Sequence, residues 1–244
     1  MDFSIYTLVL LALAAVCTGI NKTGFPGFGV IVVVMLPMIM PAKVSTGYLL
    51  PLLIFGDIIA VLYWRQNALW NIVFKLVPWI FAGIIIGFAL MNIIPDNYYG
   101  HFLGGIVVVL FIFDFIRRYF HIPIPMGKPI ITAFLGILAG IMTMMINAAG
   151  PVVIIYLLAM NISKENFIGT CAWTYFICNL VKVPFSYAQG LITLESLSLN
   201  LKFLPFVLLG GVLGIVFMNK VPSRIFNVIT WLIAFLGGIR LFFS

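Results

Sequence analysis

The sequence predicts an all-α integral membrane protein, because of its composition, the length of its apolar runs and the scatter of its charges. Of its 244 residues, 64% are hydrophobic and only 8% are charged, whereas a soluble domain averages about 25% charged residues. The mean hydropathy is +1.25. The apolar runs are about 16 to 23 residues long and do not alternate with period two, which excludes a porin-like barrel and favours a helical bundle.

The basic residues indicate how the chain is oriented in a lipid bilayer. The formal net charge is +7, but the bases are scattered singly at segment ends, which is typical of a topology signal. We therefore expect lipid as a partner and no nucleic acid. The N-terminus has no basic region before its apolar run, so we expect it to be the first span and not a cleaved signal peptide.

Short loops separate ten predicted apolar segments. They cover residues 3–20, 28–40, 46–64, 72–94, 98–117, 129–147, 150–161, 167–188, 203–219 and 223–242. The second and seventh are short for a bilayer that needs about 20 residues, so we interpret them as half-helices, broken or re-entrant near the midplane. A polar linker, 119–128, separates a first repeat, 1–118, from a second repeat, 129–244.

The two halves resemble each other in sequence. In an alignment of the halves, Asn21 matches Asn147 and Gly24 matches Gly150, both at an offset of 126 residues. Five segments per repeat is an odd number, which predicts inverted topology. If each short segment instead fuses with its predecessor, each repeat has four crossings and the repeats are parallel. Downstream, seven identities recur at an offset of 127: Lys75 and Lys202, Pro78 and Pro205, Gly83 and Gly210, Gly87 and Gly214, Met91 and Met218, Asn92 and Asn219, and Pro95 and Pro222.

Loop charges assign the two faces of the predicted bundle. By the positive-inside rule, the face with more bases is cytoplasmic, so both termini are expected outside the cytoplasmic membrane of the cell. The richer face carries Arg65, Lys75, Arg117, Arg118, Lys128, Lys164, Lys220 and Arg224, and the other carries Lys43, Lys202 and Arg240.

Two stretches interrupt the apolar runs with polar residues, glycine and proline. They are NKTGFPGFG at 21–29 and NAAGP at 147–151. A broken backbone inside a bilayer is tolerated only where it is buried in protein or lines a cavity. Helix N-termini at such breaks carry partial positive charge, so two of them with Asn side chains favour an anion. The simpler alternative is that these residues only permit tight packing or kinks.

Three charged residues have two interpretations each. Asp57 and Lys182 lie mid-way through long apolar segments, where ionised groups are costly and need partners or a wet cavity. Either Lys182 binds substrate and Asp57 is a coupling group, or the two form a structural ion pair between the repeats. Asn179 would share a helix face with Lys182. Lys22 is the best anion ligand if the first break lies at the midplane, and an ordinary loop lysine if the break is shallow.

The stretches TGINKTGFPGFGVIVVVMLP and NAAGPVVIIYLLAMNISKENFIGTCAWTYFICNLVK, each with a downstream PxxxxGxxxG, resemble the sulfite exporter TauE/SafE family. The family is also called the 4-toluene sulfonate uptake permease family, and the resemblance covers nearly the whole chain. It implies transport of sulfur-containing oxyanions and organosulfonates, such as sulfite or sulfoacetate, without an ATP-binding domain. It places the anion site at Asn21, Lys22, Gly24, Pro26, Gly27, Asn147, Gly150, Pro151, Asn179 and Lys182.

The predicted function is secondary transport of a small anion by alternating access, with Asp57 as the only candidate coupling group. The alternatives are an anion channel, which would need a continuous polar lining, and a transporter of a non-sulfur organic anion. We expect no enzyme, no cofactor and no metal site, because the sequence has no metal-spaced His or Cys and no nucleophile beside a base. A homodimer is compatible with this interpretation.

Overall fold

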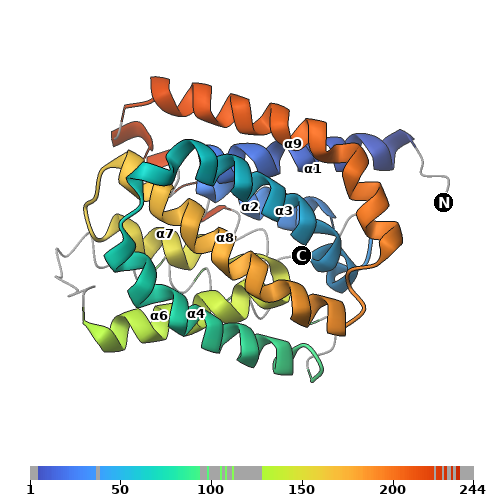
Figure 1. Cartoon of the computed structure of the whole chain (residues 1–244), viewed down its shortest axis with the longest axis horizontal. Coiled ribbons are helices and arrows are strands. Elements are labelled where there is room, and N and C mark those ends of the chain that lie inside the picture. The colour runs from blue at the N-terminus through green and yellow to red at the C-terminus, as the bar shows by residue number, and fades with distance from the viewer. Residues whose placement is uncertain are drawn as a thin grey trace.

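The computed structural model describes residues 5–36, 39–93 and 128–222, with isolated positions in 98–112 and 224–236. Every regular element in this described part is a helix (Figure 1). Five of these helices are long and apolar enough to cross a membrane, so the predicted class of an all-α membrane protein is confirmed. The predicted segments 98–117 and 223–242, and the linker apart from Lys128, lie largely outside the described residues.

The described helices follow the predicted segments closely. In the first half, α1 spans Ile5–Thr23, the 3-10 turn η1 Pro26–Phe28, α2 Gly29–Met35, α3 Ala42–Trp64, the 3-10 turn η3 Arg65–Asn67 and α4 Trp70–Leu90. In the second half, α6 spans Pro129–Ile146, α7 Gly150–Leu158, α8 Lys164–Ala188 and α9 Leu194–Lys220. With 7 and 9 residues, α2 and α7 reach less than half of a hydrocarbon core about 30 Å thick, so they are half-helices as predicted.

Local capping explains why α9 starts earlier than the predicted residue 203. The Thr193 side chain accepts a hydrogen bond from the Ser196 backbone N–H, and the Ser196 side chain accepts one from the Thr193 backbone N–H. This reciprocal capping box fixes the first turn at Leu194. Further along, α9 changes direction (Figure 1), and Pro205 within it removes one helical hydrogen bond.

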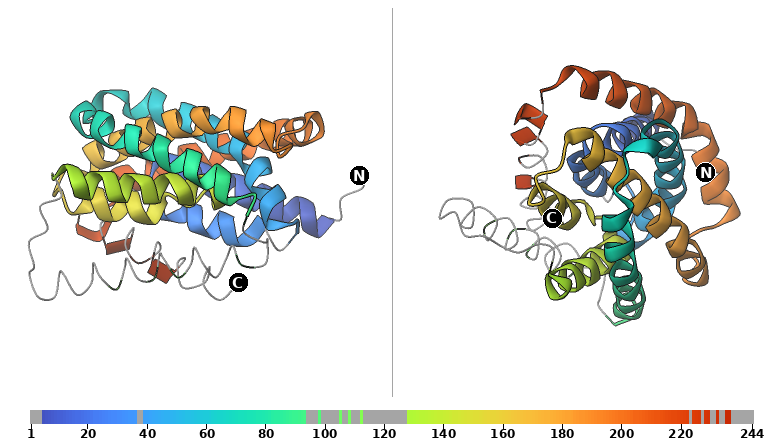
Figure 2. Two further views of the ribbon diagram at one scale, coloured as in Figure 1. Left: turned by 90° about the horizontal axis from the view of Figure 1, so that it is seen from below. Right: turned by 60° about the vertical axis from the view of Figure 1, so that its left-hand side comes forward.

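Two pairs of long helices, each with one member from each half, form two sides of the bundle. Helix α9 lies along α1, and α6 lies along α4 (Figures 1 and 2). Both pairs run parallel, because contacts advance in the same direction along both members. The residues that meet are Val16 with Gly210 and Ile20 with Gly214 in the first pair, and Ile137 with Gly83 and Ile141 with Gly87 in the second.

Helices α3 and α8 pack against each other and run antiparallel. Gly47, near the start of α3, lies against Leu191, which follows α8. Lys43 at the start of α3 donates a hydrogen bond to the carbonyl of Met91, just after α4, and Lys164 at the start of α8 donates to those of Met218 and Val221 at the end of α9. Consequently α1, α3 and α9 run in one direction, and α4, α6 and α8 run in the other.

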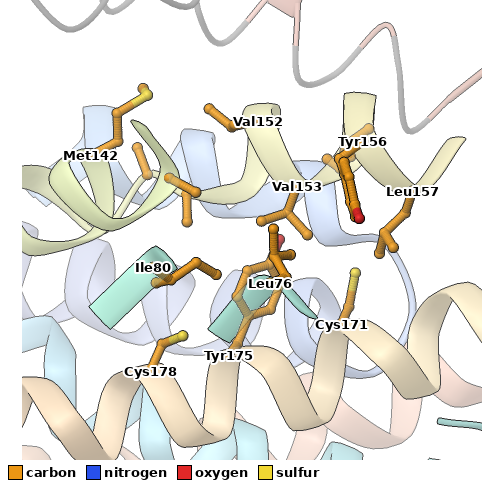
Figure 3. Packing of buried hydrophobic residues seen from close by; sticks show 14 of the residues in the cluster. Leu76, Ile80, Met142, Val152, Val153, Tyr156, Leu157, Cys171, Tyr175 and Cys178 are labelled. Atoms are coloured by element: carbon orange, nitrogen blue, oxygen red, sulfur yellow. The ribbon is translucent and has the colours of Figure 1, made fainter. Parts of the chain in front are cut away.

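The helix α7 is enclosed within the bundle. Residues 152–157 are each no more than 3% exposed. In Figure 3, Val153 and Leu157 of α7 point toward Leu76 of α4 and toward Tyr175 and Cys171 of α8. This packing holds the N-terminus of α7 in the interior of the bundle, where the first half of the chain also has its break.

The close approach of α1 and α9 depends on glycine. A Cβ atom at Gly210 would lie 2.0 Å from the backbone oxygen of Val16, whereas one at Gly211 would first meet the side chain of Ile59 at 3.2 Å. We expect Gly210→Ala to cost about 1 to 3 kcal/mol of stability, because two backbones must separate. Gly211→Ala, its control, should cost less, because a side chain yields more easily. Thermal unfolding of the purified protein, followed by size-exclusion chromatography, measures both; equal midpoints would contradict the expectation.

Candidate functional site

The first break begins later than the sequence predicts. Asn21 and Lys22 lie in the last turn of α1, which continues to Thr23, so the expectation that Lys22 stands inside the break is wrong. Tertiary contacts extend the helix. The indole N–H of Trp64 donates to the Thr23 carbonyl at 2.8 Å, and the Thr23 hydroxyl donates to the Gly211 carbonyl at 2.8 Å. These bonds anchor the end of α1 to α3 and α9.

The second break begins at Asn147, directly after α6. This residue has a left-handed backbone with φ of 57°, which Asn tolerates better than most residues. The N–H groups of Asn147 and Ala148 donate to the carbonyls of Thr143 and Met142 at 3.0 and 3.3 Å, which closes the helix end. The Asn147 amide also donates through Nδ2 to the Thr46 carbonyl at 2.9 Å. The break is therefore fixed to α3 as well as to α6.

The N-termini of the two half-helices differ in what they offer a ligand. In α2, the first N–H, at Gly29, donates to Asn21 Oδ1 at 2.7 Å, so this donor already has an acceptor. In α7, Gly150 and Val152 occupy first-turn positions whose N–H groups have no acceptor within the helix, and Pro151 has no N–H. The breaks meet, since a Cβ atom at Gly150 would lie 3.3 Å from the Pro26 carbonyl oxygen.

A cavity of about 30 Å³ lies where the two breaks meet. On α3 and α8 its walls include Leu53 and Asn179, which lie near the middle of each helix. Its volume is enough for about two water molecules. Seven of the predicted site residues line it: Asn21, Lys22, Pro26, Asn147, Gly150, Pro151 and Asn179.

Lys22 is paired with Asp57 beside this cavity. The Lys22 Nζ lies 2.8 Å from Asp57 Oδ1, and both side chains are buried. The same ammonium lies 4.7 Å from the ring centroid of Tyr175, a cation–π distance. Asn179 donates through Nδ2 to Asp57 Oδ2 at 2.6 Å. Both carboxylate oxygens therefore have a positive or polar partner.

Lys182 lies behind the cavity wall and is fully buried. Its Nζ donates to Asn147 Oδ1, to Thr143 Oγ1 at 3.3 Å and to Asn179 Oδ1 at 3.4 Å. Among the described side chains, the ion-pair partner of Asp57 is Lys22, so the predicted alternative of a direct Asp57–Lys182 pair is not observed. Asn179 links the two instead, because it donates to Asp57 and accepts from Lys182.

Three predicted site residues do not line the cavity. Gly24 packs on α9, where a Cβ atom would lie 2.6 Å from the Gly214 carbonyl oxygen, Gly27 lies in η1, and Lys182 is held behind the wall by residues that do line it.

Sequence reasoning missed two polar lining residues, Thr18 and Thr143, as well as apolar ones such as Leu49. Each threonine lies four positions, one helical turn, before a predicted polar residue, Lys22 and Asn147 respectively, and this spacing was the available signal. Of the described residues, no group of three His, Cys, Asp or Glu side chains is placed to hold a metal ion.

Apolar helices of membrane-crossing length, two half-helices and a cavity with polar and apolar walls between their breaks are typical of a multi-pass membrane transport protein. A family model described as sulfite exporter TauE/SafE matches residues 11–241. The chain therefore belongs to the sulfite exporter TauE/SafE family, whose members are transporters. Comparison with curated proteins gives no significant match, and neither does comparison with solved structures.

Proposed function

We propose that this protein carries a small sulfur-containing oxyanion or organosulfonate across the cytoplasmic membrane by alternating access, and that the cavity between the two breaks is its binding site. The observation that carries the proposal is an excess of buried positive charge. Lys22 and Lys182 are buried in and behind the cavity wall, while Asp57 is the one described carboxylate beside them. A buried charge needs a counter-charge, and a bound anion would supply it.

The cavity walls have the chemistry that an organosulfonate requires. The ammonium of Lys22 and the N–H groups at the start of α7 would bind the oxygens of the head group through charge-assisted hydrogen bonds. Val32, Leu49 and Leu53 form an apolar wall that suits an organic substituent. Since a sulfonate is larger than the present cavity of about 30 Å³, binding requires the walls to move apart, as expected for a transporter that opens to each side in turn.

Alternating access is supported by the directions of the helices. Taken in chain order, α1, α3 and α4 correspond to α6, α8 and α9, and each helix runs opposite to its counterpart, as inverted repeats require. Because α1 then corresponds to α6 and α9 to α4, the pair α1–α9 corresponds to the pair α4–α6. A rocking motion of one pair against the other would expose the cavity first on one side of the membrane and then on the other.

The proposed orientation rests on charges at the helix ends. Lys164 donates to the carbonyl of Val221 directly after Lys220, and Gly169 of the same helix lies against Asn67, near Arg65. These three bases therefore lie at the same end of the bundle, which we assign to the cytoplasm by the positive-inside rule. The start of α1 lies at the opposite end, so the N-terminus would be outside.

The direction of transport sets what Asp57 would have to do. In a cell that is negative inside, efflux of an anion gains about 2.3 kcal/mol per charge per 100 mV, so export needs no coupling ion. Uptake would need one. Asp57 would then be the coupling group, because its protonation would release Lys22 from the ion pair.

Reconstituted protein tests the proposal. Proteoliposomes preloaded with unlabelled methanesulfonate should accumulate external labelled methanesulfonate, because an alternating-access carrier exchanges substrate across the membrane. Acetate should compete weakly. Accumulation without preloading, together with single-channel currents, would instead support an anion channel, and equal competition by acetate would support a carrier of non-sulfur organic anions.

A further inference from the structure

The charges around the cavity bear on which ligand charge the site can accommodate. Resting on the proposed function, we infer that the site selects singly charged anions over doubly charged ones, and that Asp57 sets this limit. The inference narrows the substrate class to monoanions such as an alkylsulfonate or hydrogen sulfite. Sulfate, and the doubly charged sulfoacetate, are disfavoured.

The orientation of two amides provides acceptors for a charged Lys182. The Nδ2 groups of Asn147 and Asn179 donate to Thr46 O and Asp57 Oδ2, which are acceptors only, so the amide oxygens must face Lys182. Together with Thr143 Oγ1, these oxygens give the Lys182 Nζ three acceptors. An ammonium has three donors, so these oxygens can satisfy the charged form of Lys182 completely. We therefore take Lys182 as the positive charge that Asp57 does not neutralise.

The sum of charges at the site is then one positive. Lys22 and Asp57 cancel each other across 2.8 Å, and the acceptors of the fully buried Lys182 among the described residues are neutral. One negative charge on the ligand balances the site. A second would have no counter-charge among the buried described residues, and an unbalanced charge at low dielectric is strongly disfavoured.

The position of Asp57 increases the discrimination. A ligand bound to Lys22 would share that ammonium with the Asp57 carboxylate, which is fully buried and cannot turn toward solvent. The aromatic face of Tyr175 covers another side of the same ammonium. A doubly charged ligand would therefore meet a carboxylate that repels it at close range, and the repulsion grows in proportion to the ligand charge.

Methanesulfonate and sulfate are suitable probes, because they have similar head groups and carry one and two negative charges across the neutral pH range. Purified full-length protein in detergent is titrated with each anion, and binding is followed by displacement of labelled methanesulfonate. We expect wild-type protein to bind methanesulfonate at least about tenfold more tightly than sulfate, a difference of about 1.4 kcal/mol. In Asp57→Asn, which keeps a polar group beside Asn179 but adds one net positive charge, the ratio should fall by at least about tenfold.

The control variant is Glu195→Gln, which makes the same change to an exposed carboxylate in the first turn of α9 and should leave the ratio unchanged. Equal wild-type affinity for the two anions would overturn the inference and leave the proposed function standing. No binding of either anion would overturn both. A folded Asp57→Asn variant with the wild-type ratio would show that Asp57 does not set the limit. If that variant does not fold, the wild-type ratio still decides whether the site selects by charge.

Discussion

Replacing Lys22 with methionine is expected to abolish anion flux and to destabilise the protein, and replacing Asp57 with asparagine in the same chain should restore only the stability. Lys22 lines the cavity and lies 2.8 Å from Asp57, and both side chains are buried. Lys22→Met alone leaves a buried carboxylate without its counter-ion, which costs about 3 to 5 kcal/mol. The double variant Lys22→Met/Asp57→Asn removes that carboxylate charge but still lacks the ammonium that is proposed to bind the substrate.

The two effects are separated by measuring flux and unfolding on the same preparations. Methanesulfonate exchange in proteoliposomes should fall at least about a hundredfold in both variants, equivalent to about 2.7 kcal/mol. The thermal midpoint should fall in the single variant and recover in the double variant. Lys202→Met is the matched control, because Lys202 is exposed on α9, and it should change neither. Wild-type exchange by the double variant would mean that the Lys22–Asp57 pair is only structural.

Much of the fold could be predicted because its signals are local. Apolar length separates the membrane-crossing helices from the half-helices α2 and α7, and Gly-Pro at 150–151 marks the start of α7. A polar residue deep in an apolar run needs a partner, so Asp57, Asn179 and Lys182 could be chosen from the sequence. All three belong to one hydrogen-bonded cluster.

The partners within the cluster could not be predicted, because they depend on helix packing between residues far apart in sequence. Two lysines, Lys22 and Lys182, lie near enough to be candidate ion-pair partners of Asp57. Lys22 is the actual partner because α1 approaches α3 closely, whereas Lys182 bonds to Asn179. The same is true of the end of α1. Local bonds close that helix end, since the N–H groups of Gly24 and Phe25 donate to the Ile20 carbonyl. The long-range bonds from Trp64 and to Gly211, which anchor Thr23, could not be predicted.

Packing also favours a different correspondence between the first helices of the two halves. The sequence pairing of Asn21 with Asn147 would place Ile20 opposite Ile146. However, Ile20 meets Gly214 as Ile141 meets Gly87, and these two glycines are equivalent in the repeat that the sequence predicts. The difference arises because Asn21 lies within the last turn of α1, whereas Asn147 follows the end of α6.

In this packing register Lys22 corresponds to Thr143, and the contact of Lys22 with Asp57 corresponds to that of Thr143 with Lys182. In the first half, an acid on α3 faces a base on α1. In the second half, a base on α8 faces a hydroxyl on α6. Two similar frameworks therefore give an electrostatically asymmetric site. As a result, Lys182 has no carboxylate partner of its own in the described part of the chain.

The second large effect is expected at Lys182, where methionine should abolish exchange although the side chain does not line the cavity. Lys182→Met removes the positive charge that is proposed to attract the anion. It also removes the donor that orients the amide oxygens of Asn147 and Asn179. Leaving two buried oxygens without a donor costs about 1 to 3 kcal/mol each, so the thermal midpoint should fall as well.

A lysine-to-arginine change separates charge from shape at this position. Lys182→Arg keeps the charge but has a planar donor set that cannot reproduce the three ammonium contacts in a fully buried site, so it should bind methanesulfonate weakly and exchange it slowly. Binding titrations and counterflow on Lys182→Met, Lys182→Arg and the exposed control Lys75→Met measure this order. If Lys182→Met binds and exchanges methanesulfonate like wild type, the positive charge behind the wall has no part in attracting the anion, and Lys22 with the α7 N-terminus must suffice.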